Sequence, residues 1–121
     1  MKNSIQVGTK KISNTKSGTN KYHAKKEIVD GIRFDSRKEA SRYRQLKLME
    51  KAKAIQDLQV HVKYPLFKKN EYGSEVRYIA DFVYYENGHL VVEDVKGFKT
   101  GVYKLKKRIL AEQRGIVIRE T

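Results

Sequence analysis

The chain has 121 residues, the length of one domain, and it contains no cysteine, so disulfide bonds and thiolate metal sites are excluded. It carries 27 lysines and arginines against 14 aspartates and glutamates, a formal net charge of +13. This excess favours a polyanionic partner, most simply nucleic acid, although a merely basic soluble protein has the same composition. No apolar run reaches membrane-spanning length and the polar N-terminal stretch does not resemble a signal peptide, so we expect a cytoplasmic protein without membrane contact.

The basic residues are unevenly distributed. Residues 1–26 contain seven lysines and no acid, and residues 96–108 contain six basic residues and no acid. Residues 1–20 are polar and rich in Ser, Thr, Asn, Gly and Lys, which predicts a flexible basic arm. Residues 21–121 are then expected to form a single folded domain.

The first expected elements are a hairpin and a helix. The stretch "EIVDGIRF", residues 27–34, predicts a small hairpin that turns at Asp30-Gly31. The residues that follow are dense in good helix formers and predict a helix from about Ser36 to Ala52.

Three strands, a helix and a short strand are expected next. The strands cover residues 58–67, 76–85 and 89–96, the last two joined by a turn at Asn87-Gly88. The helix covers residues 102–114 and stops at Gly115, and "IVIRE" closes the chain as a strand. The order helix, strand, strand, strand, helix, strand predicts an α/β fold with a parallel final crossover, a mixed sheet and flanking helices.

The hairpin "YIADFVYYENGHLVVEDVKG" carries acids where a sheet core is expected. If Asn87-Gly88 forms a type I′ turn, Phe82 pairs with Glu93 and Asp81 pairs with Asp94. Because side chains alternate between the faces of a sheet, Asp81, Asp94 and Lys96 share one face, and Glu93 falls on the other. A register shift of one residue would instead place Glu93 opposite Asp81.

Two directly opposed aspartates, with Cβ atoms roughly 5 Å apart, repel each other unless a cation lies between them. Their oxygen ligands suit Mg²⁺ or Mn²⁺, which activate water and stabilise charge on a phosphodiester. Lys96 lies close enough to stabilise the attacking water or the developing charge. The alternative is a solvated sheet edge at which Lys96 forms a simple ion pair.

Glu39, near the start of the first helix, is a possible third carboxylate. At about 100° per residue it falls between Tyr43 and Leu46, on a face expected to meet the sheet. However, Ser36-x-x-Glu39 also matches a capping box, in which the glutamate reaches back to the helix N-terminus. The pattern leaves both roles open.

In the second helix, Val102, Leu105 and Ile109 are expected to form the packed stripe, with Lys106 within or beside it. The basic residues around this helix suit contacts with a nucleic-acid backbone, although each taken singly is equally consistent with a solvated side chain. The candidates for DNA binding are Lys99, Lys104, Lys106, Lys107 and Arg108.

An acid on one strand followed by acid-x-lysine on the next, in this order of elements, resembles the PD-(D/E)XK nuclease superfamily. The matching positions are Asp81 and the "DVK" of Asp94-Val95-Lys96. More closely, the blocks "FDSRKEASRY", "YIADFVYY", "VVEDVKG" and "TGVYKLKKRIL" look like a small phage-encoded family of that superfamily. Its members are described as of unknown function or as candidate Holliday junction resolvases, and the resemblance covers roughly residues 21–121. Ala80 stands where the superfamily name has proline.

The resemblance implies a restriction-endonuclease-like fold and Mg²⁺- or Mn²⁺-dependent hydrolysis of branched or duplex DNA in phage recombination or replication, in the cytoplasm of the host cell. It implies that Asp81, Asp94 and Glu39 are metal ligands and catalytic residues and that Lys96 is the catalytic lysine. A homodimer is expected by analogy with the resolvase-like members. Two rivals remain: a catalytically inactive nucleic-acid-binding or host-interaction protein on the same fold, and a nuclease without junction preference.

Overall fold

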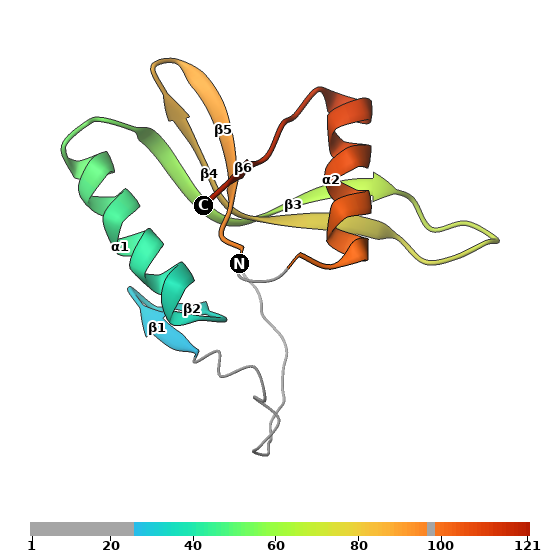
Figure 1. The fold of residues 1–121 in the computed structure, drawn as a ribbon, viewed down its shortest axis with the longest axis horizontal. Helices are drawn as coiled ribbons and strands as arrows, with labels where there is room; N and C mark the ends of the chain where they lie inside the picture. Colours follow the sequence, from blue (N-terminus) through green and yellow to red (C-terminus); the bar gives the residue numbers. More distant parts are fainter. Residues whose placement is uncertain (1–25, 97–98) are drawn as a thin grey trace. The chain divides into compact units, whose positions relative to one another are not determined.

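A computed structural model describes residues 26–96 and 99–121, which divide into two compact units between Ala40 and Ser41. The predicted arm, residues 1–20, lies outside the described residues. The described chain contains a two-stranded sheet, a four-stranded mixed sheet and two helices, which confirms the expected α/β class (Figure 1). In these residues no helix has the length and apolar character needed to cross a membrane.

The first unit contains the predicted N-terminal hairpin. Strands β1 (Glu27–Val29) and β2 (Ile32–Phe34) pair antiparallel around Asp30-Gly31, whose φ angles of 52° and 75° are both positive. Two positive φ angles are what a type I′ turn requires, and they favour Asp-Gly. Helix α1 (Arg37–Lys51) begins in this unit, and its first turn is capped by Ser36, whose Oγ accepts a hydrogen bond of 3.1 Å from the N–H of Glu39.

The second unit is built on the four-stranded sheet. Strands β3 (Gln56–Phe67), β4 (Val76–Glu86) and β5 (His89–Asp94) are antiparallel neighbours. Strand β6 (Arg119–Glu120) lies parallel to β5, which confirms the expected parallel step after helix α2 (Gly101–Arg114).

The register of the β4–β5 hairpin is the one counted from the turn. Asn87 and Gly88 have φ angles of 53° and 77°. The ladder runs from Glu86–His89 to Phe82–Glu93 without a shift. The tight turn therefore fixes which side chains of β5 share a face, because an inserted residue would exchange the two faces.

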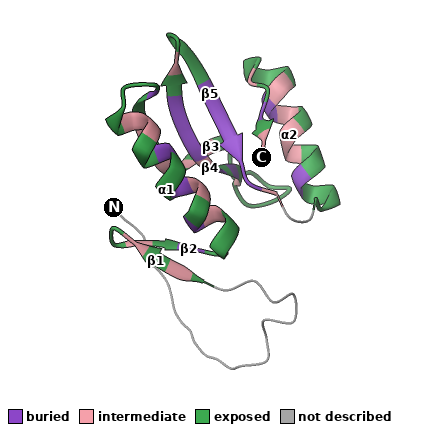
Figure 2. Ribbon diagram, turned by 60° about the vertical axis from the view of Figure 1, so that its left-hand side comes forward, coloured by how far each residue is buried: buried purple, intermediate pink, exposed green. Residues whose placement is uncertain are grey.

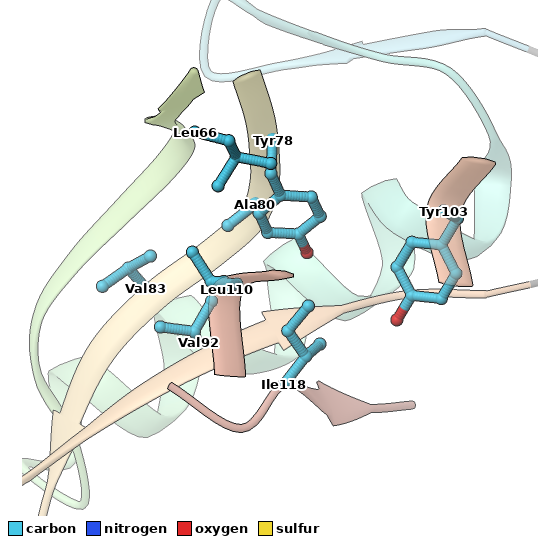
Figure 3. Close-up of a cluster of buried hydrophobic side chains, with 8 residues drawn as sticks. All are labelled: Leu66, Tyr78, Ala80, Val83, Val92, Tyr103, Leu110 and Ile118. Atoms are coloured by element: carbon cyan, nitrogen blue, oxygen red, sulfur yellow. The ribbon is translucent and has the colours of Figure 1, made fainter. Parts of the chain in front are cut away.

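Both faces of this sheet carry apolar side chains, and much of β4 and β5 is buried (Figure 2). On one face, Tyr43 of α1 stacks on Phe82 with ring centroids 6.4 Å apart. On the other, Tyr103 and Leu110 of α2 join a cluster drawn from the sheet (Figure 3). The sheet members of this cluster are Leu66, Tyr78, Ala80, Val83 and Val92, with Ile118 just before β6.

The predicted stripe of α2 is wrong at two of its three positions. Val102 and Leu105 are 64% and 58% exposed, and only Ile109 packs against the cluster. Tyr103 and Leu110, seven residues apart, lie on one side of the helix, and Leu105 lies about 160° from Tyr103. Two apolar faces compete in this sequence, and the face with the large Tyr103 ring is buried because it meets Tyr78, 6.4 Å away between centroids.

Candidate functional site

The candidate site lies where β5 stops pairing with β4 and starts pairing with β6. The ladder with β4 ends at Phe82–Glu93, so the expected pair of Asp81 with Asp94 does not form, and both residues lie one position beyond the last pair. Asp94 pairs with Glu120 of β6 instead. The Oδ2 of Asp81 accepts a hydrogen bond of 2.8 Å from the N–H of Val95, the residue just after β5. The Asp81 side chain thus satisfies a backbone donor at the point where the β4–β5 ladder stops.

Asp94 is a buried acid with an incompletely satisfied carboxylate. It is 2% exposed, and its Oδ2 accepts no hydrogen bond from the described residues. The Nζ of Lys96 lies 3.0 Å from the same oxygen, which makes an ion pair without the direction of a hydrogen bond. Buried polar atoms normally have hydrogen-bond partners, and exceptions are found where a water, an ion or a functional role has to be considered. The burial argues against a solvated sheet edge.

Besides burial, the charges of Asp81 and Asp94 both raise the pKa of two tyrosines, Tyr78 and Tyr103. Burial raises the pKa of Tyr78, and the charge of the Asp94 carboxylate, its contact with the phenol and the charge of Asp81 raise it further. Burial, followed by the hydrogen bond to Glu120 and the same two charges, raises the pKa of Tyr103. Since both carboxylates act on the same two phenols, Asp81 and Asp94 occupy one neighbourhood, on the α2 side of the sheet.

Lys96 lies between the acid and an aromatic ring. Its ammonium is 3.0 Å from Oδ2 of Asp94 and 4.2 Å from the centroid of the Tyr103 ring. A cation at this distance from an aromatic ring is attracted to the ring face. The side chain of Lys96 remains partly exposed, so its ammonium is held in place and is still within reach of a molecule at the surface.

Glu93 belongs to a different network. Its Oε2 accepts hydrogen bonds from Nε of Arg42 at 2.6 Å and from Oγ1 of Thr121 at 3.0 Å. Its Oε1 accepts from Nη2 of Arg42 at 2.9 Å and from the hydroxyl of Tyr84 at 2.5 Å. Burial alone would raise the pKa of Glu93, but these bonds lower it below its ordinary value. Glu93 is fully satisfied as a structural acid, and the alternative register that would bring it opposite Asp81 does not occur.

Glu39 belongs to the first unit, where its N–H contributes to the cap at Ser36. This bond is the first half of the capping box considered for the sequence. Throughout residues 26–96 and 99–121 there is no group of three or more His, Asp or Glu side chains that could hold a metal ion together. The role of Glu39 as a third metal ligand stays a prediction.

The five basic residues considered for DNA binding have three different environments. Lys99 and Lys107 both pair with Glu120, at 2.8 and 3.1 Å. Arg108 pairs with Glu112 at 2.8 Å on the exposed side of α2. Lys104 is exposed and Lys106 half-buried, and neither forms an ion pair with another residue in the described part of the chain.

Glu120 is the charged residue near this site that the sequence did not indicate. Its register opposite Asp94 places the two side chains on the same face of neighbouring strands, which are about 4.8 Å apart. Hydrogen bonds from Lys99, Tyr103 and Lys107 lower its pKa to about 2. The only signal in the sequence is the expected parallel strand at residues 116–120, and no turn fixes that strand's register with β5.

The fold and the site together define a small mixed α/β domain with two acids and a lysine gathered where two strands separate. The chain belongs to the family DUF1064, described as a protein of unknown function, which matches residues 19–119. No curated protein matches the sequence. Among solved structures, protein VC1899 from Vibrio cholerae is similar at 19% sequence identity, with a TM-score of 0.36. That similarity covers 78% of this chain and 35% of the length of the other.

Proposed function

We propose that this protein is a metal-dependent DNA endonuclease that hydrolyses phosphodiester bonds. One observation carries the proposal: the Oδ2 of Asp94 is buried, accepts no hydrogen bond of good geometry from the described residues, and lies 3.0 Å from the ammonium of Lys96. An acid kept in this state stabilises the fold little, because its charge is desolvated and only partly compensated. A binding or catalytic role explains its presence better than packing does.

Each of the three residues has a separate task in this proposal. Asp81 and Asp94 would hold one divalent cation, and two carboxylates are what Mg²⁺ commonly takes from a protein. The bound cation would supply Lewis-acid activation of water and neutralise charge on the phosphodiester. Lys96 would place its ammonium, steadied by the Tyr103 ring at 4.2 Å, where negative charge develops in the transition state.

The donor set fits a hard cation. The site offers carboxylate oxygens, and the chain has no cysteine. The orphaned Oδ2 of Asp94 provides a ligand atom that no hydrogen bond from the described residues occupies. The preference for branched DNA, the homodimer, and the third ligand Glu39 come from the resemblance to PD-(D/E)XK nucleases and are proposed on that ground.

A second candidate is a basic DNA-binding protein on the same fold, without catalysis. It is favoured by the absence of a cluster of three metal-binding side chains within residues 26–96 and 99–121. In this alternative, Lys96 is simply the ion-pair partner of Asp94, and the net charge of +13 serves binding alone.

The test is a cleavage assay on a labelled four-way junction and a linear duplex of matched sequence, with Mg²⁺, Mn²⁺ or EDTA. We expect cleavage with either metal and none in EDTA. Asp94→Asn and Lys96→Ala should each abolish cleavage and still bind DNA. The matched controls Asp57→Asn and Lys63→Ala, both at exposed positions of β3, should cut at the wild-type rate.

The outcomes separate the candidates. Binding without cleavage under every metal condition would favour the DNA-binding protein. Cleavage that survives in Asp94→Asn would remove the proposed site. Equal cleavage of junction and duplex would leave a nuclease but discard the junction preference.

A further inference from the structure

Three donors from α2 and the segment before it meet at one carboxylate. The Nζ of Lys99 lies 2.8 Å from Oε1 of Glu120, and the Nζ of Lys107 lies 3.1 Å from Oε2. The hydroxyl of Tyr103 donates to Oε2 at 2.7 Å. Two ammonium groups and a hydroxyl around two oxygens form a ready-made site for an anion, which we call the α2 anion cluster (Lys99, Tyr103 and Lys107).

The cluster is built at the surface of the second unit, although one of its members is in the core. Lys99 and Lys107 keep 48% and 39% of their side chains exposed. Tyr103 is buried, and its ring packs beside Tyr78 (Figure 3). A rigid phenol therefore fixes the position of the anion, while the two flexible lysines remain open to solvent and to a larger ligand.

The cluster shares residues with the proposed nuclease site. Glu120 pairs with Asp94 across adjacent strands. The ring of Tyr103, whose hydroxyl binds Glu120, also lies under the ammonium of Lys96 at 4.2 Å. A phosphate in place of the Glu120 carboxylate would thus lie one strand away from Asp94. Phosphates in one DNA strand follow each other closely enough for neighbours to occupy both places.

We propose that Glu120 fills the α2 anion cluster in the free protein as a stand-in for a DNA phosphate, and that a backbone phosphate displaces it when DNA binds. This inference rests on the proposed function, since it names the contact that holds DNA next to the nuclease site. A phosphodiester of the DNA backbone carries one negative charge on two non-bridging oxygens, so it matches a carboxylate in charge and in number of acceptor oxygens. Glu120 therefore competes with the ligand and keeps the lysines oriented until the ligand arrives.

The electrostatics of the cluster agree with this role. The hydrogen bonds from Lys99, Tyr103 and Lys107 hold the pKa of Glu120 at about 2. The same three donors can contact another anion of similar size. Arg108 of α2 does not take part in this convergence, because it pairs with Glu112 at the exposed side of the helix.

The experiment compares duplex binding by the full-length wild type, Glu120→Gln and Glu112→Gln in EDTA, over a series of salt concentrations. Both substitutions add one unit of positive net charge, but only Glu120→Gln empties the cluster of its carboxylate. The glutamine retains an oxygen that can accept from Tyr103. We expect Glu120→Gln to bind DNA about tenfold more tightly than wild type. Glu112→Gln should gain less than about threefold, as a surface charge change does.

Two further measurements test whether the α2 anion cluster causes the tighter DNA binding of Glu120→Gln. Adding Lys99→Ala and Lys107→Ala to Glu120→Gln should cancel the tighter binding. In the otherwise native chain the same two lysine substitutions should reduce the salt slope of log K by about two, one for each lost phosphate contact. This measurement does not require the Glu120 variant to fold.

An affinity of Glu120→Gln equal to that of Glu112→Gln would overturn the inference, and so would an unchanged salt slope in the double lysine variant. If the wild type still binds and cuts DNA in these cases, the proposed function stands and only the role of Glu120 falls. If neither wild type nor any variant binds DNA, the proposed function and this inference both fail.

Discussion

Glu93 and Asp94 are neighbours in β5 and both are buried, but their carboxylates differ in the hydrogen bonds that they accept. Both oxygens of Glu93 accept hydrogen bonds, from Arg42, Tyr84 and Thr121. The Oδ2 of Asp94 accepts none from the described residues and lies 3.0 Å from the ammonium of Lys96. Glu93 therefore uses both of its oxygens to hold the fold together, whereas Asp94 keeps one oxygen that accepts no hydrogen bond from the described residues.

Replacing Glu93 should therefore cost stability. Glu93→Ala removes the partner of the Arg42 guanidinium, which is mostly buried, and leaves that charge without compensation. We expect the free energy of unfolding to fall by about 3–5 kcal/mol, as when one half of a buried ion pair is lost. Urea denaturation measures this. Tyr84→Phe, which deletes one hydrogen bond to Glu93, should cost about 1 kcal/mol. A loss below 1 kcal/mol for Glu93→Ala would contradict the structural role.

Replacing Asp94 should change the stability little but should remove the binding of metal. Asp94→Asn removes a desolvated charge whose Oδ2 accepts no hydrogen bond from the described residues, so the free energy of unfolding should change by less than about 1 kcal/mol. Millimolar Mg²⁺ or Mn²⁺ should raise the Tm of the wild type by about 3 °C or more, because a ligand that binds only the folded state stabilises it. The variant should show no such rise. Equal metal-dependent shifts in wild type and Asp94→Asn would place the metal elsewhere.

That these two acids lie on opposite faces of the sheet could be predicted from the sequence because the turn is tight. Asn87 and Gly88 accept the two positive φ angles of a type I′ turn, and with the turn fixed every pair up to Phe82–Glu93 follows by counting. The separation of the strands just beyond that pair could not be predicted. It depends on Asp81 accepting from Val95 and on β6 pairing with Asp94, and no turn sets the register of a parallel strand.

Helix α2 shows a second limit of the sequence. Val102, Leu105 and Ile109 have helical spacing, and so do Tyr103 and Leu110. Periodicity cannot choose between two apolar faces of similar size, since the choice depends on what the sheet presents. The sheet presents Tyr78, which packs on the Tyr103 ring. That choice also places the Nζ of Lys107 3.1 Å from Oε2 of Glu120, the residue that pairs with Asp94. The helical periodicity does not indicate this contact.

The depressed pKa of Glu120 predicts how stability depends on pH. Its folded-state pKa of about 2 lies below the ordinary value of 4.5, because of the hydrogen bonds from Lys99, Tyr103 and Lys107. The ionised form is thus favoured by folding, so its contribution is complete above about pH 4.5 and disappears as the pH falls toward 2. Unfolding of wild type and Glu120→Gln should be compared across this range. The difference between them should shrink steadily on acidification, and a constant difference would contradict the assignment.

Tyr103 offers the last prediction, because its ring and its hydroxyl do different things. The ring lies 4.2 Å from the ammonium of Lys96, and the hydroxyl donates to Glu120. Tyr103→Phe keeps the ring, so at the proposed nuclease site its kcat should stay near the wild-type value, whereas its KM should rise because the α2 anion cluster loses its hydroxyl. Its free energy of unfolding should fall by about 1 kcal/mol. Tyr103→Leu removes the cation–π contact that steadies Lys96. Its kcat for DNA cleavage should fall about tenfold, since a desolvated cation–π contact is worth about 1–2 kcal/mol, with a KM close to that of Tyr103→Phe. Because leucine also disturbs the packing against Tyr78, both variants are assayed well below their Tm. Equal losses of kcat in the Phe and Leu variants would assign the effect to the hydroxyl and its bond to Glu120, and the ring would then have no part in positioning Lys96.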